Sequence, residues 1–143
     1  MSHLCLTSGV YLALVQHLNA VYPYEGCGLL AGSWSETTAV SLYAIENIAS
    51  NPRRQFLMSP QSQLAAFLEI EAAGLDLLAI YHSHPHGPET PSATDMAQAY
   101  YPELIQVIVS LASPDPVLRA FWLTPTQYRE IQLLVAPAVT VQK

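Results

Sequence analysis

Between Ser8 and Pro23 apolar residues recur every three or four positions, which is the period of one face of an α-helix. The residues on this stripe are Tyr11, Leu14, Val15, Leu18 and Tyr22. Ser8 has a side chain that can cap a helix, and Pro23 disfavours helical geometry in the residue before it. We therefore expect the first helix to lie between these two residues.

The rest of the chain alternates between apolar runs and helical patterns. Ser59 and Pro60 combine a capping hydroxyl with proline at the first helical position, which predicts a second helix that ends at Gly74. A short helix is expected from about Ser92 to Tyr100. The predicted strands are Leu4–Thr7, Gly28–Trp34, Thr37–Glu46, Phe56–Met58, Leu77–Tyr81, Leu104–Leu111, Val117–Thr124 and Gln127–Val135. This alternation predicts an α/β protein with a mixed sheet, two longer helices and one short helix, in a single domain over residues 1–143.

The composition is apolar and unusually poor in charge. Of 143 residues, 51% are hydrophobic and only 11% are charged, with a mean hydropathy of +0.25. Ordinary soluble domains carry about 25% charged residues. Intrinsic disorder is excluded because it requires low hydrophobicity. A net charge of −6 argues against a nucleic-acid partner, which needs a basic surface to bind phosphates.

Residues 1–24 carry no charged side chain, so a membrane segment must be considered. The polar residues Gln16, His17 and Asn19 interrupt this stretch, which is therefore not the run of about 20 apolar residues that spans a bilayer. A secretory signal needs a positively charged start, and the first basic residue is Arg53. We expect a cytoplasmic protein with no membrane partner.

A cluster of histidines follows the most apolar predicted strand. His82 and His84 are two residues apart, and in an extended chain such residues point to the same side. Asp95 falls within the predicted short helix, where a returning loop can bring its carboxylate to the same place. Two imidazoles and one carboxylate with an open fourth position form a catalytic zinc arrangement. Taken singly, Ser92 and Asp95 fit a helix N-terminus equally well, but the combined spacing is more specific.

The segment from His82 to Asp95, HSHPHGPETPSATD, resembles the metalloprotease motif of the JAMM (MPN+) family without insertion or substitution. Upstream, the segment 23–30, PYEGCGLL, is similar to the second signature of that family and contains Glu25. The order of helices and strands is similar too, and the resemblance covers roughly residues 4–135. It looks closest to the compact prokaryotic Mov34/MPN/PAD-1 proteins.

The resemblance implies an MPN-like, cytidine-deaminase-like fold with one zinc ion per chain. His82, His84 and Asp95 would be the metal ligands. Glu25 would act as general acid and base, and Ser92 would stabilise the oxyanion. These roles suit the residue types, because a carboxylate can move a proton from water to a leaving amine and a hydroxyl can donate to a tetrahedral oxyanion.

The implied function is that of a zinc-dependent peptidase or isopeptidase. The bond cut would follow the C-terminal Gly-Gly tail of a ubiquitin-like or sulfur-carrier protein, held by β-augmentation at an exposed strand edge beside the metal. Two alternatives are a non-catalytic MPN scaffold for protein assembly and a metal hydrolase similar to the RadC group. The five filled motif positions argue against the scaffold, and the acidic composition argues against DNA. The shortage of charge also predicts an exposed apolar surface, used for self-association into a homo-oligomer or for docking a ubiquitin-like face.

Four further residues near the motif have less specific interpretations. Ser83 lies between the two histidines, so we expect its hydroxyl to point away from the metal and to have a structural role. Cys27 shares a strand face with Glu25 and is expected to pack as a small hydrophobic residue. His86 is interpreted as a spectator in the loop. Cys5 and Cys27 are too few for a disulfide framework, which favours a reducing compartment.

Overall fold

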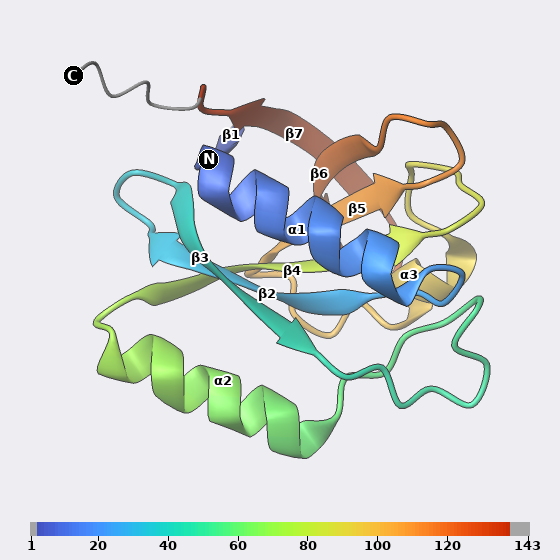
Figure 1. The fold of residues 1–143 in the computed structure, drawn as a ribbon, viewed down its shortest axis with the longest axis horizontal. Helices are drawn as coiled ribbons and strands as arrows, with labels where there is room; N and C mark the ends of the chain where they lie inside the picture. The colour runs from blue at the N-terminus through green and yellow to red at the C-terminus, as the bar shows by residue number, and fades with distance from the viewer. Residues whose placement is uncertain (1–2, 138–143) are drawn as a thin grey trace.

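Seven strands form one mixed sheet that curls around the first helix, and two further helices lie outside it (Figure 1). The computed structural model describes residues 3–137; the one lysine, Lys143, lies outside this range. The elements are β1 (His3–Leu6), α1 (Ser8–Val21), β2 (Cys27–Ser33), β3 (Thr38–Ile45), α2 (Pro60–Ala72), β4 (Asp76–His84), α3 (Ala93–Ala97), β5 (Ile105–Ser110), β6 (Val117–Leu123) and β7 (Tyr128–Val135). The predicted mixed sheet, two longer helices and one short helix are confirmed.

The sheet is closed, with the strand order β1-β3-β2-β4-β5-β6-β7 and β7 returning to β1. β1 runs parallel to β3 and to β7, β4 runs parallel to β5, and the remaining neighbours are antiparallel. Within residues 3–137 every strand therefore has a neighbour on both sides. The free strand edge that we expected beside the metal is not an edge of this sheet.

The helices α1 and α2 cover opposite faces of the sheet. Val10, Leu14 and Leu18 are the buried residues of α1, and they join a core cluster that includes residues from all seven strands. Ala66 and Ile70 of α2 pack in a second cluster, against β2, β3 and β4. Because successive residues of a strand face opposite sides, β4 contributes Tyr81 to the first cluster and Ile80 to the second. The same alternation controls where the histidines of β4 point.

The helix boundaries differ from the prediction at two ends. The N-cap of α1 is Thr7, whose Oγ1 accepts a hydrogen bond from the Val10 amide at 3.2 Å, so the prediction of Ser8 is wrong by one residue. Both residue types can cap, and the register of the packed apolar stripe decides between them. Ser59 caps α2 as predicted. α3 ends at Ala97 instead of near Tyr100, because the chain turns at Gln98 and leads into the loop before β5.

Two strand predictions also change. β4 continues through His84 instead of ending at Tyr81, because β5 pairs with it in register up to the contact between His84 and Ser110. The histidines thus lie in the strand itself and not in the loop after it. The predicted strand Phe56–Met58 makes one isolated bridge, from Met58 to Asn47, and is otherwise an extended segment of a loop.

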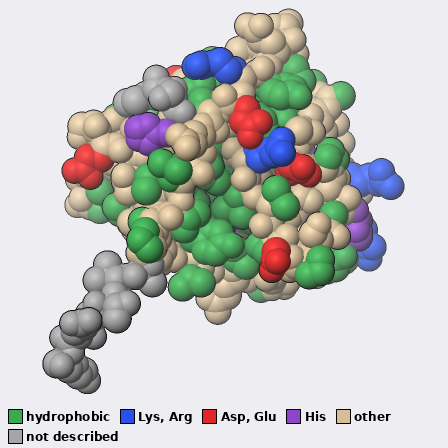
Figure 2. All heavy atoms as spheres, turned by 90° about the horizontal axis from the view of Figure 1, so that it is seen from above, with side chains coloured by type: hydrophobic (Ala, Val, Ile, Leu, Met, Phe, Trp, Pro, Cys, Tyr) green, Lys and Arg blue, Asp and Glu red, His purple; other side chains and the backbone are tan. Residues whose placement is uncertain are grey.

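The surface carries many apolar side chains and few charges. On α2 both leucines are exposed, Leu64 at 58% and Leu68 at 59%, while Ala66 and Ile70 are buried. Figure 2 shows one face on which a few acidic and basic side chains, some of them adjacent, lie among hydrophobic side chains and uncharged atoms. No helix within residues 3–137 has the length and apolar character needed to cross a membrane. Cys5 and Cys27 are both free thiols, as expected.

The close approach of β2 and β3 at Gly32 gives a test of the closed sheet. A Cβ atom there would clash with the carbonyl oxygen of Thr38, which belongs to the backbone and cannot rotate away. We expect Gly32→Ala to lower the free energy of unfolding by about 3 kcal/mol or more, as overpacking does. Gly9→Ala is the control, since a Cβ on this α1 residue meets nothing within 4 Å and should stabilise the helix by up to about 1 kcal/mol. Chemical denaturation of both variants measures the difference, and equal stabilities would contradict the packing described.

Candidate metal centre

Three side chains from two elements converge on one point. His82 and His84 come from β4 and Asp95 comes from α3. The two Nε2 atoms lie 3.1 Å apart, and the Asp95 oxygens lie 3.2 Å from the Nε2 of His82 and 3.0 Å from that of His84. All three groups are almost completely buried. The structure thus brings together the three residues that the sequence motif predicts as metal ligands.

Local structure explains the convergence. The pleat of β4 points both imidazoles to the α2 side, and pairing with β5 continues the strand through His84 while β2 pairs with it up to His82. A capping box orients Asp95: the Ser92 hydroxyl accepts from the Asp95 amide at 3.0 Å, and the Ser92 amide donates to Asp95 Oδ2 at 2.9 Å. The motif serine therefore has a structural role at the start of α3, and its hydroxyl hydrogen remains free to donate elsewhere.

The arrangement fits a divalent metal. A tetrahedral zinc ion with bonds of about 2.0–2.1 Å to nitrogen or oxygen places its ligand atoms about 3.3 Å apart. The three separations in this cluster are 3.0 to 3.2 Å. His84 Nδ1 lies 2.6 Å from the carbonyl oxygen of Pro88, which can only accept, so this nitrogen carries a proton. The Nε2 atom faces the cluster, where it donates to Asp95 in the metal-free chain and can bind a metal once it has lost its proton. An outer hydrogen bond such as that to Pro88 is the usual way in which a protein orients a metal-binding histidine.

The electrostatics of the cluster favour a bound cation. Burial alone raises the pKa of Asp95, but hydrogen bonds from His82 and His84 outweigh burial and hold the pKa well below its usual range. Burial likewise lowers the pKa of His84, and its bonds to Asp95 and Pro88 reverse the direction. Asp95 is therefore an anion that needs positive charge beside it, supplied here by the imidazoles and equally by a metal ion.

Glu25 lies in the same cleft and is buried without a partner for its carboxylate. Its side chain is 5% exposed, and Oε1 has no hydrogen-bond partner among the described residues. Burial raises the pKa of Glu25 to about 7, with opposing smaller effects from His84 and Asp95. The cleft, about 380 Å³ in volume, is lined by Glu25, Arg53, Arg54, His84, Pro85, His86, Gly87, Pro88 and Ser92. A carboxyl group with this pKa can accept or release a proton near neutral pH.

Two hydrogen bonds join the Glu25 segment to the histidine strand. The amide of Gly26 donates to the Ser83 hydroxyl at 2.9 Å, and the amide of Ser83 donates to the carbonyl of Gly26 at 3.0 Å. Ser83 therefore faces away from the metal position and has the structural role that we predicted. Cys27 is fully buried, lies outside the metal cluster and packs with α2, so its predicted role as a packed residue is also confirmed.

Asn47 organises the loop beside the site, a role that the sequence did not reveal. Its amide nitrogen donates to the carbonyls of Glu25 and Gln55 at 2.9 and 3.0 Å. Its amide oxygen accepts from the amides of Ala49 and Leu57, both at 3.0 Å. The side chain thus links the Glu25 backbone to the extended segment 55–57. An asparagine after a strand suits any turn, and only these distant contacts distinguish it.

The surroundings of the cleft add further groups. Arg53 and Arg54, which the sequence did not single out, lie at its opening together with His86. His86 packs edge-to-face on Tyr22, with ring centroids 5.8 Å apart, and its spectator role stays a prediction.

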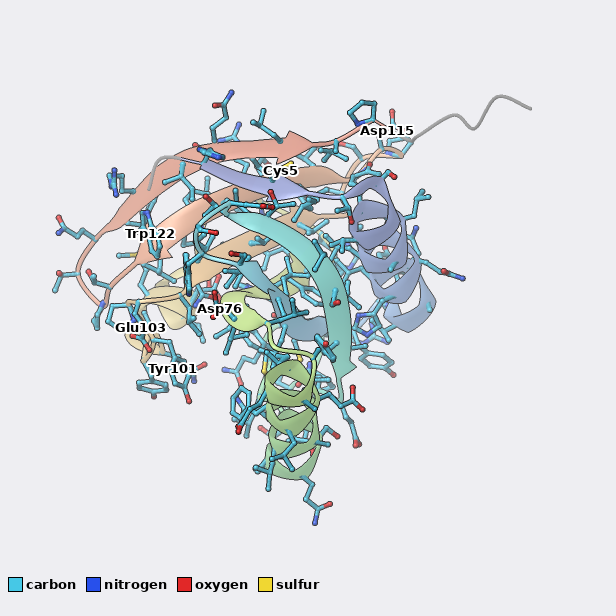
Figure 3. All side chains as sticks on the ribbon, turned by 90° about the vertical axis from the view of Figure 1, so that its left-hand side faces the viewer. Cys5, Asp76, Tyr101, Glu103, Asp115 and Trp122 are labelled. Atoms are coloured by element: carbon cyan, nitrogen blue, oxygen red, sulfur yellow. The ribbon has the colours of Figure 1, made fainter. Side chains whose placement is uncertain are left out.

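An apolar cavity of about 150 Å³ lies beside His82 and Asp95 on the side of α2 and α3. It is lined by Phe56, Leu57, Met58, Gln63, Ile80, His82, Asp95, Gln98, Ala99, Tyr100, Tyr101, Gln106 and Leu123. Tyr101 projects from the loop after α3 at the outside of the molecule (Figure 3). An exposed apolar surface next to the candidate metal centre is what the low charge of the sequence led us to expect.

Comparison with protein families gives one match. Residues 7–124 match the family described as prokaryotic homologs of the JAB domain. The chain belongs to this prokaryotic JAB family. The match covers most of the chain and confirms the resemblance to JAMM/MPN proteins drawn from the motifs.

Several JAB-family relatives have names that describe peptidases. A desampylase of Haloferax volcanii is 34% identical over 113 residues, which cover 79% of this chain and 79% of that protein. A probable TtuB-protein conjugate cleaving protease of Thermus thermophilus is 41% identical, over 58% of this chain and 54% of that protein. A CysO-cysteine peptidase of Mycobacterium tuberculosis is 32% identical, over 71% of this chain and 69% of that protein.

Solved structures show the same architecture. A protein from Desulfitobacterium hafniense superposes with a TM-score of 0.86 at 30% identity, covering 95% of this chain and 94% of the other. A JAB1/MPN domain protein from Archaeoglobus fulgidus gives a TM-score of 0.63 at 17% identity, and the superposition covers 95% of this chain and 100% of the other. The MPN-type α/β fold expected from the motifs is thus confirmed.

The buried state of Glu25 predicts a pH-dependent stability of the metal-free protein. Its pKa is about 7 in the folded chain and 4.5 in the reference state, so the folded protein holds more protons between these values. Stability contributed by this group therefore falls as the pH rises from about 4.5 to about 7. We expect Glu25→Gln to remove this loss. The free energy of unfolding of the variant minus that of wild type should be larger at pH 8 than at pH 5, by on the order of 2 kcal/mol.

Thermal unfolding in the presence of a chelator measures this difference at both pH values. Glu69→Gln is the matched control, because Glu69 is exposed on α2 and its substitution should change stability equally at the two pH values. A Glu25→Gln effect that does not change with pH would contradict the buried, unpartnered carboxylate.

The four hydrogen bonds of Asn47 predict a large cost for its truncation. We expect Asn47→Ala to reduce the free energy of unfolding by about 1–3 kcal/mol, because four backbone groups lose their partner, three of them in partly buried hydrogen bonds. Asn19→Ala, on the exposed face of α1, should change it by no more than about 0.5 kcal/mol. Urea denaturation compares the two, and a small effect at Asn47 would show that the loop does not depend on this side chain.

Proposed function

We propose that the chain is a zinc-dependent peptidase or isopeptidase that hydrolyses the bond after the C-terminal Gly-Gly tail of a ubiquitin-like or sulfur-carrier protein. The observation that carries the proposal is the meeting of His82, His84 and Asp95 at one point, with His84 lining a cleft that also contains the buried Glu25 and the Ser92 side chain. The names of the JAB-family relatives, which include a conjugate-cleaving protease and a CysO-cysteine peptidase, support this substrate class.

His82, His84 and Asp95 would hold the zinc ion, one per chain, and leave a position open toward the cleft. Bound zinc would lower the pKa of a coordinated water to about 7 and polarise the carbonyl that is attacked. The buried ligands and the Pro88 hydrogen bond hold His84 in the required orientation before any substrate arrives.

Glu25 would carry the proton. Its free Oε1 accepts the proton of the attacking water, and the group then delivers this proton to the nitrogen of the leaving amine. A C–O bond forms at the glycine carbonyl carbon and the C–N bond breaks. The Ser92 hydroxyl, which keeps its hydrogen available, donates to the oxyanion, an interaction commonly worth about 3 kcal/mol.

The segment Phe56–Met58 offers a place for the extended tail. The backbone of Leu57 is directed toward residues 47 and 48, because its carbonyl accepts from the Ile48 amide and its amide donates to Asn47 Oδ1. By alternation the backbone groups of Phe56 and Met58 point the opposite way. These residues line the apolar cavity beside His82, so a tail can add there as a strand.

The scaffold alternative is less well supported. A protein used only for assembly does not require a buried, unpartnered carboxylate, which costs stability above its pKa. Here Glu25 is kept in that state beside the histidine cluster. The acidic composition again gives no support to a DNA-associated hydrolase.

Two variants separate metal binding from proton transfer. We expect Glu25→Gln to bind one zinc per chain and to lose at least about 99% of turnover, because the base is removed and the ligands stay. His84→Ala should lose zinc and activity together. The assay uses CysO and TtuB fusions that end in Gly-Gly followed by a leaving group, with zinc measured by elemental analysis.

The outcome is decisive in both directions. A metal-replete wild-type protein that holds no zinc, or a Glu25→Gln protein that cleaves at the wild-type rate, would overturn the proposal. Ser113→Ala, in the exposed loop between β5 and β6, serves as the control that keeps zinc and activity.

A further inference from the structure

Two arginines stand at the opening of the cleft in a protein that has few basic residues. Arg53 and Arg54 line it together with Glu25, His84 and Ser92. The described residues contain only two other arginines, Arg119 and Arg129, and the net charge of the chain is −6. Half of the arginines therefore lie in the cleft that would hold the reaction.

The turn that carries these arginines is fixed against the Glu25 backbone. The Glu25 amide donates to the carbonyl of Pro52 at 2.7 Å, one residue before Arg53. Within the turn, the amides of Arg54 and Gln55 donate to the carbonyl of Asn51 at 3.1 and 3.0 Å. The backbone of the turn that carries the arginines is thus tied by a hydrogen bond to the backbone of Glu25.

A contact of the Arg53 side chain also orients its guanidinium group. Its guanidinium carbon lies 5.6 Å from the centre of the Tyr24 ring, within the range of a cation–π contact. Tyr24 directly precedes Glu25, so this contact holds the guanidinium group near the mouth of the cleft.

Neither guanidinium group is neutralised within residues 3–137. Arg119 forms ion pairs with Glu89 and Glu130, each at 3.7 Å, whereas no carboxylate lies within ion-pair distance of Arg53 or Arg54. Arginine presents several N–H donors in a planar fork that matches a carboxylate. The two side chains are therefore available for an anionic group of a ligand.

The position of the pair relative to Glu25 identifies which part of a substrate it would meet. Glu25 must reach the nitrogen of the leaving amine in order to protonate it, so groups beside Glu25 face the leaving fragment. In a leaving α-amino acid, one carbon atom separates this nitrogen from a carboxylate. In a lysine isopeptide the leaving nitrogen lies at the end of a long aliphatic chain and has no anionic group nearby.

We propose that Arg53 and Arg54 bind the α-carboxylate of the leaving group, so that the preferred substrates are carrier proteins whose Gly-Gly tail is joined to one free amino acid. This inference rests on the proposed function and narrows its substrate class from protein conjugates to carrier–amino-acid adducts.

The test compares two forms of one substrate that differ only in this charge. CysO and TtuB are each extended after Gly-Gly by a single alanine, prepared as the free acid and as the carboxamide. Calorimetry measures binding of each form to zinc-loaded Glu25→Gln protein, which holds substrate without cleaving it, and kcat/KM is measured with wild type. We expect about tenfold tighter binding and faster cleavage for the free acid, with the advantage declining at high salt.

Substitutions then assign this preference to the arginines. In the double variant Arg53→Gln/Arg54→Gln the ratio of free acid to carboxamide should fall to about one, while Arg129→Gln, at an exposed site on β7, should keep the wild-type ratio. Thermal unfolding verifies that all three proteins are folded.

Three other results would contradict the proposed carboxylate site. Equal use of both forms by wild type overturns the carboxylate site and leaves the proposed peptidase intact. A double variant that weakens both forms by the same factor shows that the arginines contact the surface of the carrier instead. If neither form binds and neither is cleaved, the proposed function is overturned together with this inference.

Discussion

The pair of hydrogen bonds between Gly26 and Ser83 joins the two parts of the site. Ser83 lies between His82 and His84, and Gly26 directly follows Glu25. Because Ser83 faces the α1 side, its hydroxyl can bind the Gly26 amide while both neighbouring imidazoles face the opposite side. A displacement at this contact would move the proton-carrying carboxylate relative to the candidate metal ligands. The distance between Glu25 and the candidate metal ligands therefore depends on a structural serine.

The closed sheet supplies the rigid frame on which this contact rests. β4 lies between β2 and β5: β2 pairs with it up to His82, and β5 pairs with it up to its last residue, His84. Closure also removes free edges, which makes the protein less prone to edge-to-edge association. The strand-like surface that remains beside the site is the extended segment 56–58. The side-chain amide of Asn47 holds this segment in place through its hydrogen bonds.

The structure shows where the few charged side chains and the exposed apolar side chains lie. Two of the eleven acidic residues, Glu25 and Asp95, are buried in the site. Exposed apolar side chains lie on α2 and around the cavity beside His82, including Leu57 and Tyr100. Apolar surface next to a peptidase centre is suited to a protein substrate, because a folded partner can cover it on binding.

Some residues of the candidate site could be predicted from the sequence alone and others could not. The spacing of His82, His84 and Asp95 indicated a metal site, because strand alternation and helix capping act over only a few residues. Glu25 could be assigned only by resemblance to a family, since a carboxylate after Pro23 has no local feature that marks it as catalytic. The contacts of Asn47 and Arg53 were not predicted, because they are made with Glu25 and Tyr24, which lie more than twenty residues earlier in the chain.

The sequence by itself determined the elements, the face on which each histidine lies and the capping of α3 by Ser92, since all of these follow from backbone geometry within one turn or strand. Only the tertiary structure decided that the sheet closes through β1 and β7, that β4 runs on to His84, and that Leu64 and Leu68 stay exposed. These outcomes depend on which distant segments pair, and the hydrophobic pattern of one segment does not specify its partner.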